Sequence, residues 1–182
     1  QFTFRLIEHA SQMIEPPPHD VWYCYGEYQP LFARYPDVIF NEGLPDITNF
    51  DGKEPTLLVI DDLMQETNDA VANIFTKISH HRNVSVLYLT QNLFPKNKHA
   101  RTISLNSHYL VLFKNPRDAG QFAVLARQMY PSGSKFAVEA FKDATEKPYG
   151  YLFVDLKPDT DEQYRLRTNI FPREQTVVYV RK

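Results

Sequence analysis

The stretch that decides the fold is "TLLVIDDLM", which begins at Thr56 and ends at Met64. Its first half is an uninterrupted apolar run, and the adjacent carboxylates Asp61 and Asp62 follow that run directly. A continuous apolar run of this length is typical of a strand that is covered on both faces of a parallel sheet. Two neighbouring carboxylates repel each other and resist desolvation, so packing alone gives no reason to place them at the end of a buried strand. They therefore mark a candidate site for a positively charged ligand.

The segments on the C-terminal side of this strand alternate between helical and extended patterns. A helix is expected in "TNDAVANIFTKISHHR", residues 67–82, with Thr67 as its N-cap and one apolar face. A second buried strand, "NVSVLYLTQ", covers residues 83–91 and ends at the polar Gln91, and a third strand is expected in "SHYLVLFKNP", residues 107–116. This alternation predicts an α/β fold with a mostly parallel sheet.

Shorter elements flank this central region. An opening helix is expected to end before "EPPPHD", because three prolines cannot continue a helix. Two short strands are expected at residues 21–25 and 38–43, and two helices at residues 118–130 and 134–147. Three strand-like segments follow at residues 149–156, 164–171 and 176–182. The last three segments alternate in polarity, and we expect them to form an antiparallel, strand-rich extension over residues 149–182.

The composition is that of a globular protein. A chain of 182 residues that is 43% hydrophobic can bury a sizeable core, so a single domain over residues 1–182 is expected. The net charge of -2 gives no overall attraction to nucleic acid or anionic membrane. The single Cys24 favours a reducing compartment, and neither a membrane span nor a signal peptide is recognisable. We therefore expect a soluble intracellular protein that needs no membrane.

The polar residues at the strand ends suggest a nucleotide site. Ligands of open parallel sheets bind at the carboxyl ends of the strands, where Asp61, Asp62 and Gln91 are expected. Magnesium prefers oxygen ligands and keeps several waters, which suits indirect coordination by Asp61. Asp62 would then activate a water that Gln91 orients beside the terminal phosphate. This is the pattern of the Walker B and sensor strands of a P-loop NTPase, and the alternative is a solvated turn after a core strand.

The phosphate-binding loop of such enzymes, G-x-x-x-x-G-K-[ST], does not occur in this sequence, which contains six glycines. That loop would come immediately before the first helix. The opening helix has no capping Ser, Thr, Asp or Asn ahead of Gln1, and we therefore expect the sequence to be a fragment that starts just after the loop.

Several longer blocks resemble one family. The blocks are "LLVIDDLM", "FTKISHHRNVSVLYLTQNLF", "RTISLNSHYLVLFKNPRD" and "LARQMYP", together with the upstream "PPPHDVWYCYGEYQP". They resemble the DNA-packaging ATPase of Polinton (Maverick) elements and related adintovirus-like agents. That family is similar to the poxvirus-type packaging ATPases and belongs to the FtsK/HerA branch of P-loop NTPases. The resemblance covers residues 1–131 and implies a RecA-like fold.

The resemblance also implies a biological setting. It implies ATP and Mg²⁺ as cofactors, translocation of double-stranded DNA, and a homo-oligomeric ring with capsid proteins as further partners. The expected location is the nucleus or cytoplasm of a host cell, or the virion. Family members carry a glycine-rich loop that ends in Gly-Lys-Thr or Gly-Lys-Ser just upstream of a segment similar to "QFTFRLI". The present sequence contains no such lysine and hydroxyl, which in that family bind the phosphates and magnesium.

Arg82 matches an arginine of the family pattern in "HHRNVSV". The resemblance implies that Arg82 acts in trans, as an arginine finger on the nucleotide of a neighbouring subunit. The alternative is a cation that complements the dipole at a helix C-terminus. Arg101, in the basic segment after the second strand, is the second candidate for the finger. Lys96, Lys98 and Arg101 could instead face DNA in a ring pore or form a solvated loop.

Other clusters give weaker signals. His80 and His81 are adjacent, so both cannot easily ligate one metal from a helix, and we expect no zinc site. The aromatic residues of one short segment could stack nucleic-acid bases, but strand alternation favours core packing plus a surface aromatic; they are Trp22, Tyr23, Tyr25 and Tyr28. In the resembled ATPases the end of this strand lies near the nucleotide, which makes Glu27 a further candidate.

Two other functions remain as alternatives at this point. The first is a non-catalytic scaffold that descends from such an ATPase and has lost the phosphate-binding loop. The second is a magnesium-dependent nuclease that uses Asp61, Asp62 and Glu66 as its carboxylates.

Overall fold

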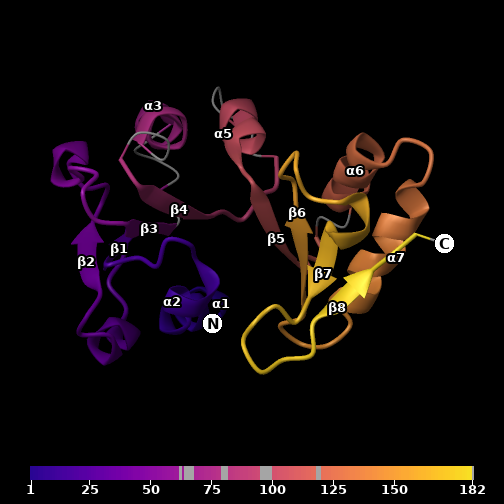
Figure 1. The fold of residues 1–182 in the computed structure, drawn as a ribbon, viewed down its shortest axis with the longest axis horizontal. Coiled ribbons are helices and arrows are strands. Elements are labelled where there is room, and N and C mark those ends of the chain that lie inside the picture. The colour runs from indigo at the N-terminus through magenta and orange to yellow at the C-terminus, as the bar shows by residue number, and fades with distance from the viewer. Residues whose placement is uncertain (62, 64–67, 79–81, 95–99, 118–119, 182) are drawn as a thin grey trace. The chain divides into compact units, whose positions relative to one another are not determined.

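The computed structural model describes residues 1–61, 63, 68–78, 82–94, 100–117 and 120–181 (Figure 1). The chain divides into two compact units, Gln1–Asn106 and Ser107–Lys182, and each contains its own four-stranded sheet. The fold class is α/β, as the sequence predicts. A single domain over residues 1–182 stays a prediction.

The first unit is built on a parallel sheet with the strand order β2-β1-β3-β4. Its strands are β1 (Asp20–Tyr25), β2 (Ile39–Glu42), β3 (Thr56–Asp61) and β4 (Val84–Leu89). Its helices are α1 (Phe2–Glu8), α2 (Ala10–Met13), α3 (Asn68–Asn73) and α5 (Ala100–Asn106), with a π-helical turn at Ile74–Ile78 and 3₁₀ turns at Pro30–Arg34 and Ile47–Asn49. The helical residues between β3 and β4 make the crossover that a parallel strand pair requires.

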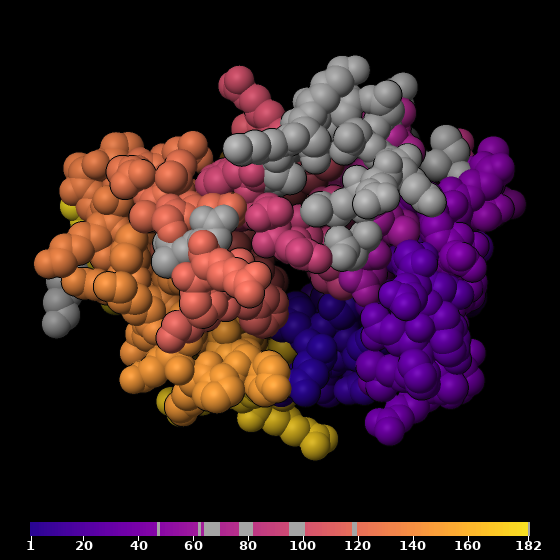
Figure 2. Space-filling view, turned by 180° about the vertical axis from the view of Figure 1, so that it is seen from behind, coloured from indigo at the N-terminus to yellow at the C-terminus, as the bar shows by residue number. Residues whose placement is uncertain are grey.

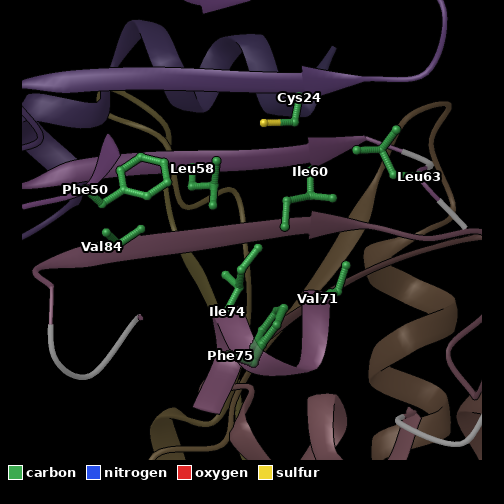
Figure 3. Packing of buried hydrophobic residues seen from close by; sticks show 9 residues of the cluster. All are labelled: Cys24, Phe50, Leu58, Ile60, Leu63, Val71, Ile74, Phe75 and Val84. Carbon is green, nitrogen blue, oxygen red and sulfur yellow. The ribbon is translucent and has the colours of Figure 1, made fainter. Parts of the chain in front are cut away.

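The central strand β3 is covered on both faces. Leu58 and Ile60 face one cluster, into which α3 and the π-helical turn project Val71, Ile74 and Phe75 (Figure 3). The alternate residues Leu57 and Val59 face a second cluster, formed with Phe4, Ala10, Tyr23, Phe32 and Val38. Side chains of a strand alternate between its two faces, so a strand with a cluster on each face must be apolar at every position. This is the physical reason for the continuous apolar run.

The second cluster ties the N-terminal helix to the sheet. In the space-filling view, the indigo N-terminal segment lies directly against the purple segment that contains β1 and β2 (Figure 2). The Phe4 ring of α1 stacks on Tyr23 of β1 at a centroid distance of 5.3 Å and on Tyr35 at 4.6 Å. Aromatic packing therefore fixes α1 on the face of the sheet that Tyr23 and Val59 line.

The second unit is an antiparallel sheet with two helices. The strand order is β5-β6-β7-β8, with β5 at Tyr109–Phe113, β6 at Tyr151–Asp155, β7 at Leu166–Thr168 and β8 at Val177–Tyr179. The helices are α6 (Gly120–Met129) and α7 (Ser134–Ala144). Helix α7 buries only alanines, Ala137, Ala140 and Ala144, and these small side chains allow it to approach β6 and β7 closely.

The structure differs from the sequence-based prediction at two places. The strand expected at residues 107–116 is β5, but it pairs antiparallel with β6 and does not belong to the parallel sheet. The antiparallel part therefore starts at Tyr109 and not at Tyr149. In addition, helix α5 at Ala100–Asn106 includes the last two residues of the basic segment 94–101, which was expected to be a loop. Within the described residues, no helix is both long and apolar enough to span a bilayer.

Candidate functional site

The carboxyl ends of the four parallel strands form a single edge. The register places Glu42, Tyr25, Asp61 and Leu89 in one row across β2, β1, β3 and β4. Neighbouring strands are about 4.8 Å apart, so the Asp61 backbone lies next to those of Tyr25 and Leu89 and about 10 Å from that of Glu42. Residues in register in a parallel sheet project to the same face. Open α/β sheets bind their ligands at this edge, which makes Asp61 the central polar group of the candidate site.

A buried tyrosine holds the Asp61 carboxylate. The Tyr23 hydroxyl donates a hydrogen bond to Asp61 Oδ2 at 2.7 Å, while Asp61 itself is half-buried. Tyr23 is only 3% exposed. Burial, and secondarily the hydrogen bond and negative charge of Asp61, raise the pKa of Tyr23 well above its usual value of 10.0. The hydroxyl is therefore a proton donor throughout the physiological pH range.

Sequence reasoning did not find this contact. The alternation of β1 places Tyr23 and Tyr25 on one face, which is the only local signal. The contact also depends on the register, which pairs Tyr23 with Val59 and Tyr25 with Asp61 and brings residues 38 positions apart together. The prediction of core packing plus a surface aromatic is confirmed, because Tyr23 is buried and Tyr28 is 59% exposed.

Gln91 lies at the same edge of the sheet as Asp61. Strand β4 ends at Leu89, the register partner of Asp61, and the chain then turns where Thr90 Oγ1 donates to the Asn92 carbonyl at 3.1 Å. Gln91 is exposed in this turn, two residues beyond Leu89, which is at most about 7 Å of chain. The structure therefore brings Asp61 and Gln91 to adjacent strand ends. Their roles toward a nucleotide stay predictions.

Several residues that the sequence analysis discusses lie outside the described part of the chain. These are Asp62, Glu66, Thr67, His80, His81, Lys96 and Lys98. The proposed water-activating role of Asp62, and the carboxylate set of the nuclease alternative, therefore stay predictions. Arg101 is described and is exposed in the first turn of α5.

Arg82 lies at the opposite end of the sheet from Asp61. It comes two residues before β4, and its Nη1 donates a hydrogen bond to the Phe50 carbonyl at 2.7 Å. The adjacent Gly52 has a φ of 78°, and a Cβ placed there would be 3.2 Å from the Arg82 Cα. Arg82 therefore fixes the turn that leads into β3, a structural role that the sequence did not predict. Its proposed action in trans on a neighbouring subunit stays a prediction.

Replacing Arg82 by Ala is expected to lower the free energy of unfolding of the first unit by about 1–3 kcal/mol, because the Phe50 carbonyl loses a charged donor. Denaturant unfolding followed by tryptophan fluorescence can measure this change, since the only tryptophan, Trp22, packs edge-on against Phe50. Arg34→Ala, which changes an exposed arginine in the same unit, is the matched control. Equal stability of the two variants would contradict the structural role of Arg82.

The donor set at the edge suits magnesium better than a tightly caged metal. Among the residues that the structure describes, no three or more His, Cys, Asp or Glu side chains are grouped so as to hold a metal ion. Magnesium is commonly bound by one or two carboxylates together with waters and substrate phosphates, so a single carboxylate at a strand end fits this mode.

Comparison of the chain with protein-family descriptions, curated proteins and solved structures gives no match. The function is therefore inferred from the carboxyl edge of the first unit and from the sequence blocks described above.

Proposed function

We propose that this chain is the RecA-like core of an ATP-hydrolysing motor that translocates double-stranded viral or transposon DNA during packaging, working as a homo-oligomeric ring. The observation that supports this proposal is the position of Asp61. This carboxylate ends the central buried strand of a parallel sheet, and Gln91 follows the end of the adjacent strand. A metal-binding acid and a polar sensor on neighbouring parallel strands would suit ATP hydrolysis.

Each residue has a defined task in this proposal. Asp61 would hold Mg²⁺, Asp62 would accept a proton from the attacking water, and Gln91 would orient that water. The chemistry that magnesium would supply there is neutralisation of the negative charge on the phosphates. Arg82 completes the site of a neighbouring subunit in trans. By the family resemblance, a glycine-rich phosphate-binding loop would complete the site.

The test uses the full-length protein that contains this chain. Phosphate release from ATP is expected to need Mg²⁺, to fall to background when EDTA removes the metal, and to return when Mg²⁺ is added back. Double-stranded DNA is expected to accelerate the reaction. Hydrolysis that continues at an unchanged rate in EDTA would contradict the proposal.

The same preparations separate the two alternatives from the motor. Cleavage of plasmid DNA with Mg²⁺ and without ATP would identify a nuclease. Absence of both cleavage and hydrolysis would favour a non-catalytic scaffold derived from such an ATPase.

A further inference from the structure

We propose that Tyr23 is a positioning residue for the metal-binding carboxylate: its hydroxyl holds Asp61 Oδ2, so that Oδ1 is presented to magnesium and its waters. This inference rests on the proposed function, because it assigns Tyr23 a role in the same site. It adds a residue from the neighbouring strand β1 to a site that otherwise consists of strand-end groups from β3 and β4.

The hydrogen bond from Tyr23 engages only one of the two oxygens of the Asp61 carboxylate. The Tyr23 hydroxyl is 2.7 Å from Asp61 Oδ2, a short distance that is typical of a hydroxyl donating to an ionised carboxylate. Among the described residues, no group other than the Tyr23 hydroxyl donates a hydrogen bond to the Asp61 carboxylate. One oxygen of the carboxylate is therefore fixed from inside the protein, and the other is available at the half-exposed edge.

The tyrosine ring is itself firmly held. Its centroid lies 5.3 Å from that of Phe4 in α1, 5.3 Å from that of Phe32 in the 3₁₀ turn, and 5.6 Å from that of Phe40 in β2. These rings come from three different elements and surround Tyr23. Because a tyrosine side chain has only two χ angles, packing of its ring also fixes the position of its hydroxyl.

Ring packing alone does not account for the hydroxyl. The ring neighbours are phenylalanines, and a phenylalanine at position 23 would fill the same space without burying a polar group. The distinguishing feature of Tyr23 is a fixed donor that is directed at the carboxylate of the strand end. Partners that orient a metal-binding side chain in this way commonly change metal affinity or activity by about 10–100-fold when they are removed.

The test is a magnesium titration of ATP hydrolysis by the full-length protein and its Tyr23→Phe variant. The magnesium concentration at half-maximal rate is expected to rise at least about 10-fold in the variant, because Asp61 is no longer held in one orientation. The KM for ATP at saturating magnesium is expected to stay within about 2-fold of the wild-type value. A general loss of stability would not raise the magnesium requirement while leaving the KM for ATP unchanged.

Tyr179→Phe is the matched control. The Tyr179 hydroxyl donates to Asp143 Oδ2 at 2.6 Å, so this variant removes a tyrosine–carboxylate hydrogen bond from the second unit. Its magnesium requirement is expected to equal that of the wild type.

The outcomes separate this inference from the proposed function. An unchanged magnesium requirement in Tyr23→Phe, together with an inactive Asp61→Asn, overturns the role of Tyr23 and leaves the motor in place. An active Asp61→Asn overturns the site itself. If Tyr23→Phe does not fold, the structure of the wild type with magnesium and an ATP analogue decides the question. The inference fails if Tyr23 no longer contacts Asp61 in that structure, and it holds if Oδ2 remains bonded while Oδ1 faces the metal.

Discussion

Replacing Leu58 by Ala is expected to lower the free energy of unfolding of the first unit by about 2–5 kcal/mol. Leu58 is fully buried in β3, the strand that pairs with both β1 and β4. Its side chain packs in the cluster that joins the sheet to α3 (Figure 3). The mutation removes apolar contacts and leaves a cavity, and a strand held between two neighbours cannot move to fill that cavity.

Chemical denaturation, with hydrogen exchange of the β3 and β4 amides, measures this loss in the first unit. The control is Leu105→Ala, the same chemical change at a residue of α5 that is 74% exposed. A surface change of this kind is expected to alter stability by no more than about 0.5 kcal/mol. Similar losses in the two variants would contradict the central place of Leu58 in the core.

The sequence predicts well those elements whose pattern is local. Strands β1, β3 and β4 lie inside the ranges expected from their apolar runs, or within one residue of them. The reason is physical, because a strand with both faces covered must be apolar at consecutive positions and so carries its own signature. Gln91 and Asp61 follow from the same logic, since the carboxyl ends of adjacent parallel strands meet at one edge.

The remaining features depend on contacts between distant residues. The pattern of β5 indicates a strand but does not tell which strand it pairs with, and β6 is about 40 residues further along the chain. The Tyr23–Asp61 hydrogen bond needs the register between β1 and β3. The bond from Arg82 to the Phe50 carbonyl needs the turn before β3 to fold back onto the start of β4. The spacing of apolar and polar residues along the sequence does not specify these pairings.

The largest functional effect is expected from Asp61→Asn in the full-length protein. Magnesium-dependent ATP hydrolysis should fall by at least about 100-fold, because the neutral amide cannot replace a carboxylate toward a hard divalent cation. Asparagine has nearly the shape of aspartate, and its side-chain oxygen can still accept the hydrogen bond from Tyr23. The free energy of unfolding should therefore change by no more than about 1.5 kcal/mol. Phosphate release, binding of a fluorescent ATP analogue and thermal unfolding measure the three quantities separately.

Asp143→Asn provides a control with the same chemistry. Asp143 also accepts a hydrogen bond from a tyrosine, at 2.6 Å from Tyr179, but it belongs to α7 in the second unit. Its replacement removes one negative charge and weakens one tyrosine bond, so any effect of these changes alone appears in both variants.

Asp62→Asn should also abolish hydrolysis while nucleotide binding is retained, since Asp62 is assigned to the water and not to the metal. A rate in Asp61→Asn above half that of the wild type would show that magnesium is held elsewhere, and the proposed motor site would then lose its central residue.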